Sequence, residues 1–170
     1  MLNVVELLMV EHVSLRLRFR LMREQQNFDS IYAIEEFVRT CHAKVEDEVV
    51  FPILKDLLFS QGKQKIVEDV LRRLEADHKL IDTIGEQIKL RTIQGDSQTL
   101  TKRIALYCST VESHNSAEEI QLFPYWSPAA SQERDASVRA LEIMNIFGMN
   151  RYYELTGISK EFLDSLTDRL

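Results

Sequence analysis

The segments HAKVEDEVVFP (residues 42–52) and HNSAEEIQLFP (residues 114–124) share the pattern His-x3-Glu-x4-Phe-Pro, and they decide the fold. Residues four apart lie on one face of an α-helix, so an imidazole nitrogen and a carboxylate oxygen can point at the same ion. With 27 acidic residues in 170, a single His-x3-Glu arises by chance roughly one time in six and is weak evidence. Two copies with matched Phe-Pro endings indicate a duplicated metal site.

The other two histidines also match each other. Glu11-His12 and Asp77-His78 are each an acid followed by a histidine, and an apolar residue comes three positions later in both. The chain therefore alternates a lone histidine with a His-x3-Glu, twice. This order predicts two similar helical hairpins.

The spacing of the four histidines predicts that they lie at one level of a helical bundle. In an up-down bundle, residues at the same height on consecutive helices are equidistant from the turn between them. The midpoints of successive histidines are positions 27, 60 and 96, in segments rich in Gly, Asn, Asp and Ser, which favour turns. We therefore predict an all-α, up-down-up-down four-helix bundle, with helices over about 3–25, 30–58, 63–93 and 98–124.

The flanking residues place each histidine on a core-facing stripe, because the positions four before and three after it are mostly apolar. One such histidine is most often a buried core residue without a metal. Burying four imidazoles and two carboxylates without partners, however, would cost on the order of a few kcal/mol for each neutral group and more for each charge. Metal coordination would offset that cost. The predicted ligands are His12, His42, Glu46, His78, His114 and Glu118.

Three further residues on the same faces are candidate ligands: Glu75, Asp82 and Tyr107. The commoner roles are a solvated or outer charge for the two acids, and core packing with a hydrogen-bonded hydroxyl for the tyrosine. We therefore keep them outside the predicted set.

With these residues the chain resembles the hemerythrin-like family, the His-His-Glu cation-binding four-helix bundles, over residues 1 to about 126. The resemblance implies a non-haem di-iron centre in which Glu46 and Glu118 bridge the ions and the four histidines are terminal ligands. Oxygen-carrying members have a fifth histidine one turn before the third-helix ligand, where this chain has Leu74. Some relatives carry a glutamate directly after the second-helix histidine, where this chain has Ala43. These departures favour a reactive site over reversible oxygen carriage.

The ligand chemistry independently favours iron. Six nitrogen and oxygen ligands without a thiolate suit iron or manganese better than a structural zinc site. We expect two Fe ions, with Mn or Zn as substitutes. If both carboxylates bridge, each ion receives two histidines and two oxygens, and positions stay open for a small ligand.

Several functions remain open. The first is a protein that binds or reacts with O2, NO or peroxide, including peroxidase- or catalase-like turnover. The second is a module that senses oxygen or iron and signals through its C-terminal helices. Oxygen carriage or storage and a metal-free helical interaction domain are the remaining alternatives.

Composition narrows the partners and the location. The chain is 45% hydrophobic, enough for a full core, and its net charge of -6 argues against binding to nucleic acid or to an anionic membrane. No apolar run reaches membrane-spanning length, and no basic region precedes the apolar start as in a signal peptide. We expect a cytoplasmic protein. Cys41 and Cys108 would differ in height by roughly 7 Å on parallel helices, so we expect buried free thiols.

Residues 127–170 are not explained by the metal motif. We divide the chain into a bundle, 1–126, and a C-terminal helical extension, 127–170, with one or two helices. Ser127-Pro128 predicts the start of a helix to about 147, and Ser159 would cap a short last helix. Pro52 is read as a kink in a continuing helix. The extension would pack on the bundle or form an interface, including a homodimer through these helices.

Overall fold

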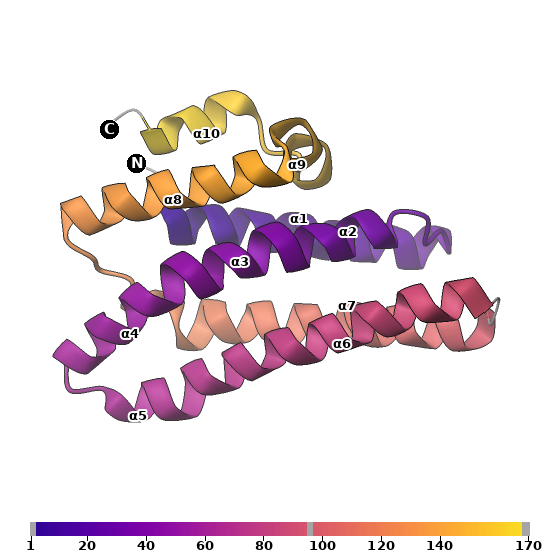
Figure 1. Ribbon diagram of the computed structural model, residues 1–170, viewed down its shortest axis with the longest axis horizontal. Helices are drawn as coiled ribbons and strands as arrows, with labels where there is room; N and C mark the ends of the chain where they lie inside the picture. Colours follow the sequence, from indigo (N-terminus) through magenta and orange to yellow (C-terminus); the bar gives the residue numbers. More distant parts are fainter. Residues whose placement is uncertain (1–2, 95–96, 168–170) are drawn as a thin grey trace.

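The computed structural model describes residues 3–94 and 97–167, and no strand occurs among them (Figure 1). The prediction of an all-helical protein is therefore confirmed. The first helix, α1 (Val4–Gln25), starts at a capping box in which the Asn3 side chain accepts from the backbone N–H of Glu6. The Glu6 carboxylate in return accepts from the backbone N–H of Asn3, so both groups at the helix start have partners.

The second long helical segment contains two π-helical turns. It consists of α2 (Ile31–Phe37), a π-turn (Val38–His42), α3 (Ala43–Val45), a second π-turn (Glu46–Val50) and α4 (Phe51–Ser60). The helix continues through Pro52, as the sequence predicted, and Pro52 follows directly on the second π-turn. The first π-turn ends at a predicted ligand and the second begins at one. Single π-turns of this kind are frequent at functional sites.

The next two long helices lie side by side (Figure 1). The first consists of α5 (Gln64–Ile66), a π-turn (Val67–Leu71) and α6 (Arg72–Gln94), and the second is α7 (Ser97–Gln121), followed by a 3-10 turn (Phe123–Tyr125). Gly62, with φ +72°, lies in the turn before α5, where the sequence predicted a break. The predicted turn residues 95 and 96 lie outside the described residues. This helical arrangement is consistent with the predicted bundle, whereas the up-down order of its helices stays a prediction.

The described part of the extension forms three helices, and not the one or two that the sequence predicted: α8 (Ala130–Phe147), α9 (Met149–Thr156) and α10 (Lys160–Thr167). Ser159 caps the last, because its hydroxyl accepts from the backbone N–H of Phe162. The predicted start at Ser127-Pro128 is two residues too early, since Ala129 and not Ser127 is the N-cap of α8, and its N–H donates to Gln132. The sequence analysis missed α9, which begins after Gly148 at φ +107°.

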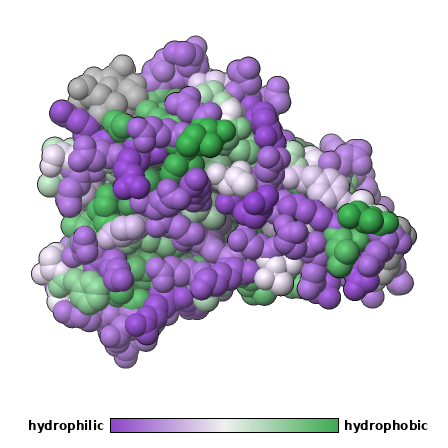
Figure 2. All heavy atoms as spheres, in the orientation of Figure 1, coloured by the Kyte–Doolittle hydropathy of each residue, from purple (hydrophilic) through white to green (hydrophobic). Residues whose placement is uncertain are grey.

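The extension packs on the face of α1 and of the α2–α4 segment, away from α6 and α7 (Figure 1). Hydrogen bonds fix α9 there: the Ser14 hydroxyl donates to the carbonyl of Thr156 at 2.5 Å, and the Arg18 guanidinium donates to the carbonyl of Leu155. An ion pair at 2.5 Å joins Arg151 of α9 to Glu36. The face of the molecule drawn in Figure 2 is mostly polar, with scattered apolar side chains. None of the described helices is long and apolar enough to cross a membrane.

Candidate metal centre

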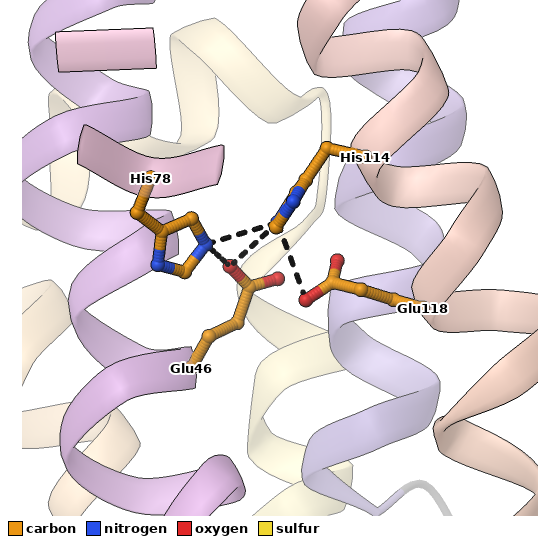
Figure 3. Close-up of side chains that lie close together, drawn as sticks. All are labelled: Glu46, His78, His114 and Glu118. Atoms are coloured by element: carbon orange, nitrogen blue, oxygen red, sulfur yellow. Dashed lines mark hydrogen bonds and ion pairs between the residues drawn. The ribbon is translucent and has the colours of Figure 1, made fainter. Parts of the chain in front are cut away.

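All six predicted ligands meet in the interior. His12 comes from α1, His42 and Glu46 come from the two π-turns, His78 comes from α6, and α7 supplies the other two. None of the six is more than 7% exposed: His12, His42, Glu46, His78, His114 and Glu118. Figure 3 shows four of them, with the Glu46 carboxylate between the imidazole of His78 and the α7 residues.

Glu46 lies at the centre of this cluster, and its two oxygens face two different pairs of histidines. Its Oε1 is 3.6 Å from Nε2 of His12 and 3.2 Å from Nε2 of His42. Its Oε2 is 3.1 Å from Nε2 of His78 and 4.0 Å from Nε2 of His114. One carboxylate therefore contacts all four imidazoles, two through each oxygen.

Glu118 contacts one histidine of each of these two pairs. Its Oε2 is 3.5 Å from Nε2 of His12, and its Oε1 is 3.4 Å from Nε2 of His114. These side chains form two groups whose atoms lie close enough together to share an ion. Glu46 belongs to both groups. The members are Glu46, His78, His114 and Glu118 in one, and His12, His42 and Glu46 in the other.

An outer carboxylate faces the Nδ1 atom of each histidine. The pairs and distances are His12 with Glu119 at 2.9 Å, His42 with Glu11 at 2.6 Å, His78 with Asp47 at 2.9 Å and His114 with Asp77 at 3.7 Å. Where the contact is a hydrogen bond, Nδ1–H donates and the Nε2 lone pair points inward. Each of these acids is adjacent in sequence to a ligand but contacts a histidine on another helix.

The interior of the cluster holds only acceptors when the imidazoles are in this tautomer. Within residues 3–94 and 97–167, six inward-facing atoms have no hydrogen-bond partner: Nε2 of His12, Nε2 of His42, and both oxygens of Glu46 and of Glu118. Nε2 of His78 and Nε2 of His114 are 2.9 Å apart, a contact that needs a proton or a cation between the two lone pairs. Two ligands bonded to one ion at about 2.1 Å lie roughly 3 Å apart, so the observed spacings suit shared cations. The residues therefore fit a metal centre.

The pKa values likewise show that the cluster requires positive charge. Burial lowers the pKa of His78, but the hydrogen bond to Asp47 and the nearby carboxylate of Glu46 outweigh burial and raise this pKa to about 10. Burial also opposes ionisation of Glu46, yet His42 and the other histidines hold the pKa of its carboxyl well below the usual range. Burial and the charge of Glu46 raise the pKa of Glu118. Without a cation, protons on the imidazoles would compensate the buried carboxylate.

The two Phe-Pro endings place aromatic rings against the site. The Phe51 ring stacks on the His78 ring with centroids 5.6 Å apart and planes 7° apart. The Phe123 ring stacks on the His12 ring at 5.7 Å and 16°. Both phenylalanines are buried, so the repeated motif also supplies an apolar cover for one histidine in each half.

The three candidate extra ligands lie outside these groups. Glu75 is exposed, and Asp82 is half-buried near the centre without belonging to either cluster. Tyr107 is fully buried and packs edge-on against Phe19. Its hydroxyl has no hydrogen-bond partner among the described residues, so the expectation of a bonded hydroxyl was wrong for this part of the chain. Leu74, at the position of the absent fifth histidine, is fully buried.

One residue of the extension reaches the outer carboxylates. The Tyr152 hydroxyl of α9 donates to Oε1 of Glu11 at 2.5 Å, and Oε2 of Glu11 faces Nδ1 of His42. Tyr152 and Glu11 are both fully buried. The sequence analysis missed this contact, because nothing in the spacing relates α9 to the metal motif. Cys41 and Cys108 are free and buried, as expected, and burial raises the pKa of both thiols.

The comparison with protein families agrees with this geometry. The family described as the hemerythrin HHE cation binding domain matches residues 3–126. The chain belongs to this family. Searches among curated proteins and among solved structures found no match. The hemerythrin match covers all six residues of the cluster and ends before the extension, so cation binding by this hemerythrin domain rests on both the family and the site.

Proposed function

We propose that this hemerythrin-domain protein is a non-haem di-iron protein whose centre binds or reacts with O2, NO or peroxide. The observation that carries the proposal is the position of Glu46, whose two oxygens each face a different pair of imidazoles. Nitrogen and carboxylate oxygen ligands without a thiolate favour iron or manganese. Bound iron would supply redox chemistry and Lewis acidity toward these small molecules.

The side chains of this protein would hold such a centre and set how many coordination positions stay open. Two histidines and one oxygen from each bridging carboxylate give each ion about four protein ligands, fewer than the six of an octahedral ion. The outer carboxylates orient the imidazoles, and the stacked phenylalanines cover one face of the His12 ring and one face of the His78 ring. The protein would thus leave coordination positions open inside a dry, rigid site. Peroxidase- or catalase-like turnover is the enzymatic form of this proposal.

Iron content of matched variants tests the metal assignment. Glu46→Ala removes the residue shared by both groups and should reduce bound iron from about two ions per chain to well below one. Glu75→Ala, an exposed acid on α6, is the control and should keep the native content. A native protein that holds no iron after purification from iron-supplied cells would refute the proposal. Equal iron in both variants would refute the bridging role.

Reactivity needs a separate experiment. The diferrous protein, mixed with O2, NO or hydrogen peroxide in a stopped-flow instrument, should change its iron absorption with at least one of them. A reversible change with O2 alone would return carriage or storage to first place. No change with any of the three would refute the reactive role while leaving iron binding intact.

Sensing of metal or oxygen is a second candidate, favoured by the contact of Tyr152 with Glu11. A change at His42 would reach α9 through two short hydrogen bonds. Hydrogen exchange of α9 should then slow when iron is added to the metal-free protein, and Tyr152→Phe should reduce that difference. Tyr153→Phe, the neighbouring half-buried tyrosine, is the control. If iron leaves the hydrogen-exchange rate of α9 unchanged in all three proteins, the sensing function is excluded.

A further inference from the structure

A small cavity adjoins the metal centre on the side of Ile81. Four of the predicted ligands line it: His42, Glu46, His78 and His114. Apolar walls come from Val38, Ile81 and Val111, and Asp82 and Asn115 are the other polar residues that reach it. The volume open to the centre of a water-sized sphere is about 10 Å³, near the smallest that holds one water molecule. The cavity therefore has room for one water-sized group, such as the outer atom of a small ligand bound at the centre.

Asn115 brings an unpartnered amide to this cavity. Its side chain is 1% exposed, and neither Nδ2 nor Oδ1 has a hydrogen-bond partner among the described residues. A buried amide normally has partners, because losing its hydrogen bonds to water is costly. The neighbouring Ser116 differs in this respect, since its hydroxyl donates to the carbonyl of Glu112. The amide of Asn115 is thus free to bind something that occupies the cavity.

The cavity lies on the other side of the centre from the residue that replaces the fifth histidine. Leu74 precedes His78 by one turn of α6, whereas Ile81 and Asp82 follow it by about one turn, and Leu74 does not line the cavity. An added ligand would therefore approach the ions from the Ile81 side. The amide Nδ2 can donate two hydrogen bonds, which suits an electron-rich ligand held at a cation.

Resting on the proposed iron centre, we infer that Asn115 is the hydrogen-bond donor to the part of a small exogenous ligand that occupies this cavity. The ligand class comprises small anions and diatomic molecules with an acceptor atom. Larger ligands are excluded by the apolar walls. Asn115 thereby sets the affinity of the centre for such ligands without being a metal ligand itself.

Azide binding to the iron-loaded, oxidised protein tests the inference, followed by its charge-transfer absorption and its infrared stretch. Asn115→Leu fills the cavity and Asn115→Ala enlarges it, but both remove the donor. Both should weaken azide binding roughly 10- to 100-fold, the range for a hydrogen bond to a charged group, and shift the stretch. Ser116→Ala, next to Asn115 but outside the cavity, should bind azide as the native protein does.

The other possible results distinguish a failure of the proposed role of Asn115 from a failure of the proposed iron centre. Iron content and thermal stability measured on every variant identify any that fail to fold or to load. Azide affinity that falls in Asn115→Leu but rises in Asn115→Ala would show a steric wall and overturn the donor role. A native protein that holds iron and binds no azide would overturn the inference alone. A native protein without iron would overturn the proposed function and the inference with it.

Discussion

The outer carboxylates show how single residues use their neighbours along the chain. Glu11 precedes one ligand but faces His42, and Asp47 follows another ligand but faces His78. Adjacent helical residues point about 100° apart, so an acid next to a ligand points toward the neighbouring helix. One short sequence unit can therefore supply both a ligand and the orienting partner of a ligand on the next helix.

Replacing an outer carboxylate should weaken metal binding without abolishing it. We expect Asp47→Ala to lower iron affinity roughly 10- to 100-fold, because His78 loses the acceptor that orients its ring. Competition with a chelator measures the change. Glu48→Ala is the matched control, since Glu48 is exposed and forms an ion pair with Lys44 at 3.7 Å, away from the histidines. Equal affinities of the two variants would contradict an orienting role.

The positions of the six clustered residues could be predicted from sequence, but their outer partners could not. Two copies of His-x3-Glu and equal distances to the turns place the histidines at one level, which the structure bears out by bringing them together. Which acid faces which imidazole depends on the rotation of each helix about its axis. Asn115 was missed for the same reason, because its lack of a partner is visible only in the packed core.

Among the helices, the long segments were predicted to within a few residues, whereas their internal turns were not. Pro52 signalled an irregularity, but the π-turns at Val38–His42 and Glu46–Val50 leave no distinct pattern in the sequence. A π-turn inserts one extra residue per turn and so changes the direction of later side chains. The His-x3-Glu pair nevertheless keeps its spacing, because α3 joins the two π-turns.

Gly85 illustrates a constraint between α6 and α2. A Cβ atom there would lie 2.8 Å from Cγ of Glu35, a buried acid that pairs with Arg39 at 3.0 Å and with Lys89 at 2.9 Å. Gly85→Ala should therefore destabilise the protein, although alanine favours a helix by about 1 kcal/mol over glycine. Ser109→Ala, at an exposed position of α7, is the control. Chemical denaturation showing a more stable Gly85→Ala protein would contradict this packing.

At the scale of the whole molecule, the sequence predicted that the extension is helical, but it did not predict where the extension packs on the bundle. Its apolar residues predicted packing, and Ser159 predicted a cap, but the break at Gly148 and the contact of Tyr152 with Glu11 depend on the folded bundle. The division into residues 1–126 and 127–170 stays a prediction. The hemerythrin match over residues 3–126 is compatible with it.

Metal should stabilise the whole fold, because the six predicted ligands come from four helical segments. Binding that saturates the site at 100 times the Kd contributes about 2.7 kcal/mol, which corresponds to a rise in Tm of roughly 5–10 °C for a chain of this size. Calorimetry of the metal-free and iron-loaded proteins measures the rise. Glu46→Ala should abolish most of it, and an unchanged Tm in the native protein would contradict the coupling of metal and fold.

We propose that Glu46 and Glu118 would each span two iron ions, one beside His12 and His42 and the other beside His78 and His114; the contacts of both carboxylates with these imidazoles support this. Anomalous diffraction at the iron edge from crystals of the protein purified without added metal tests it most directly. We predict two iron peaks roughly 3–4 Å apart, each between one pair of imidazoles and both carboxylates. A single peak, or peaks outside these six side chains, would contradict the claim.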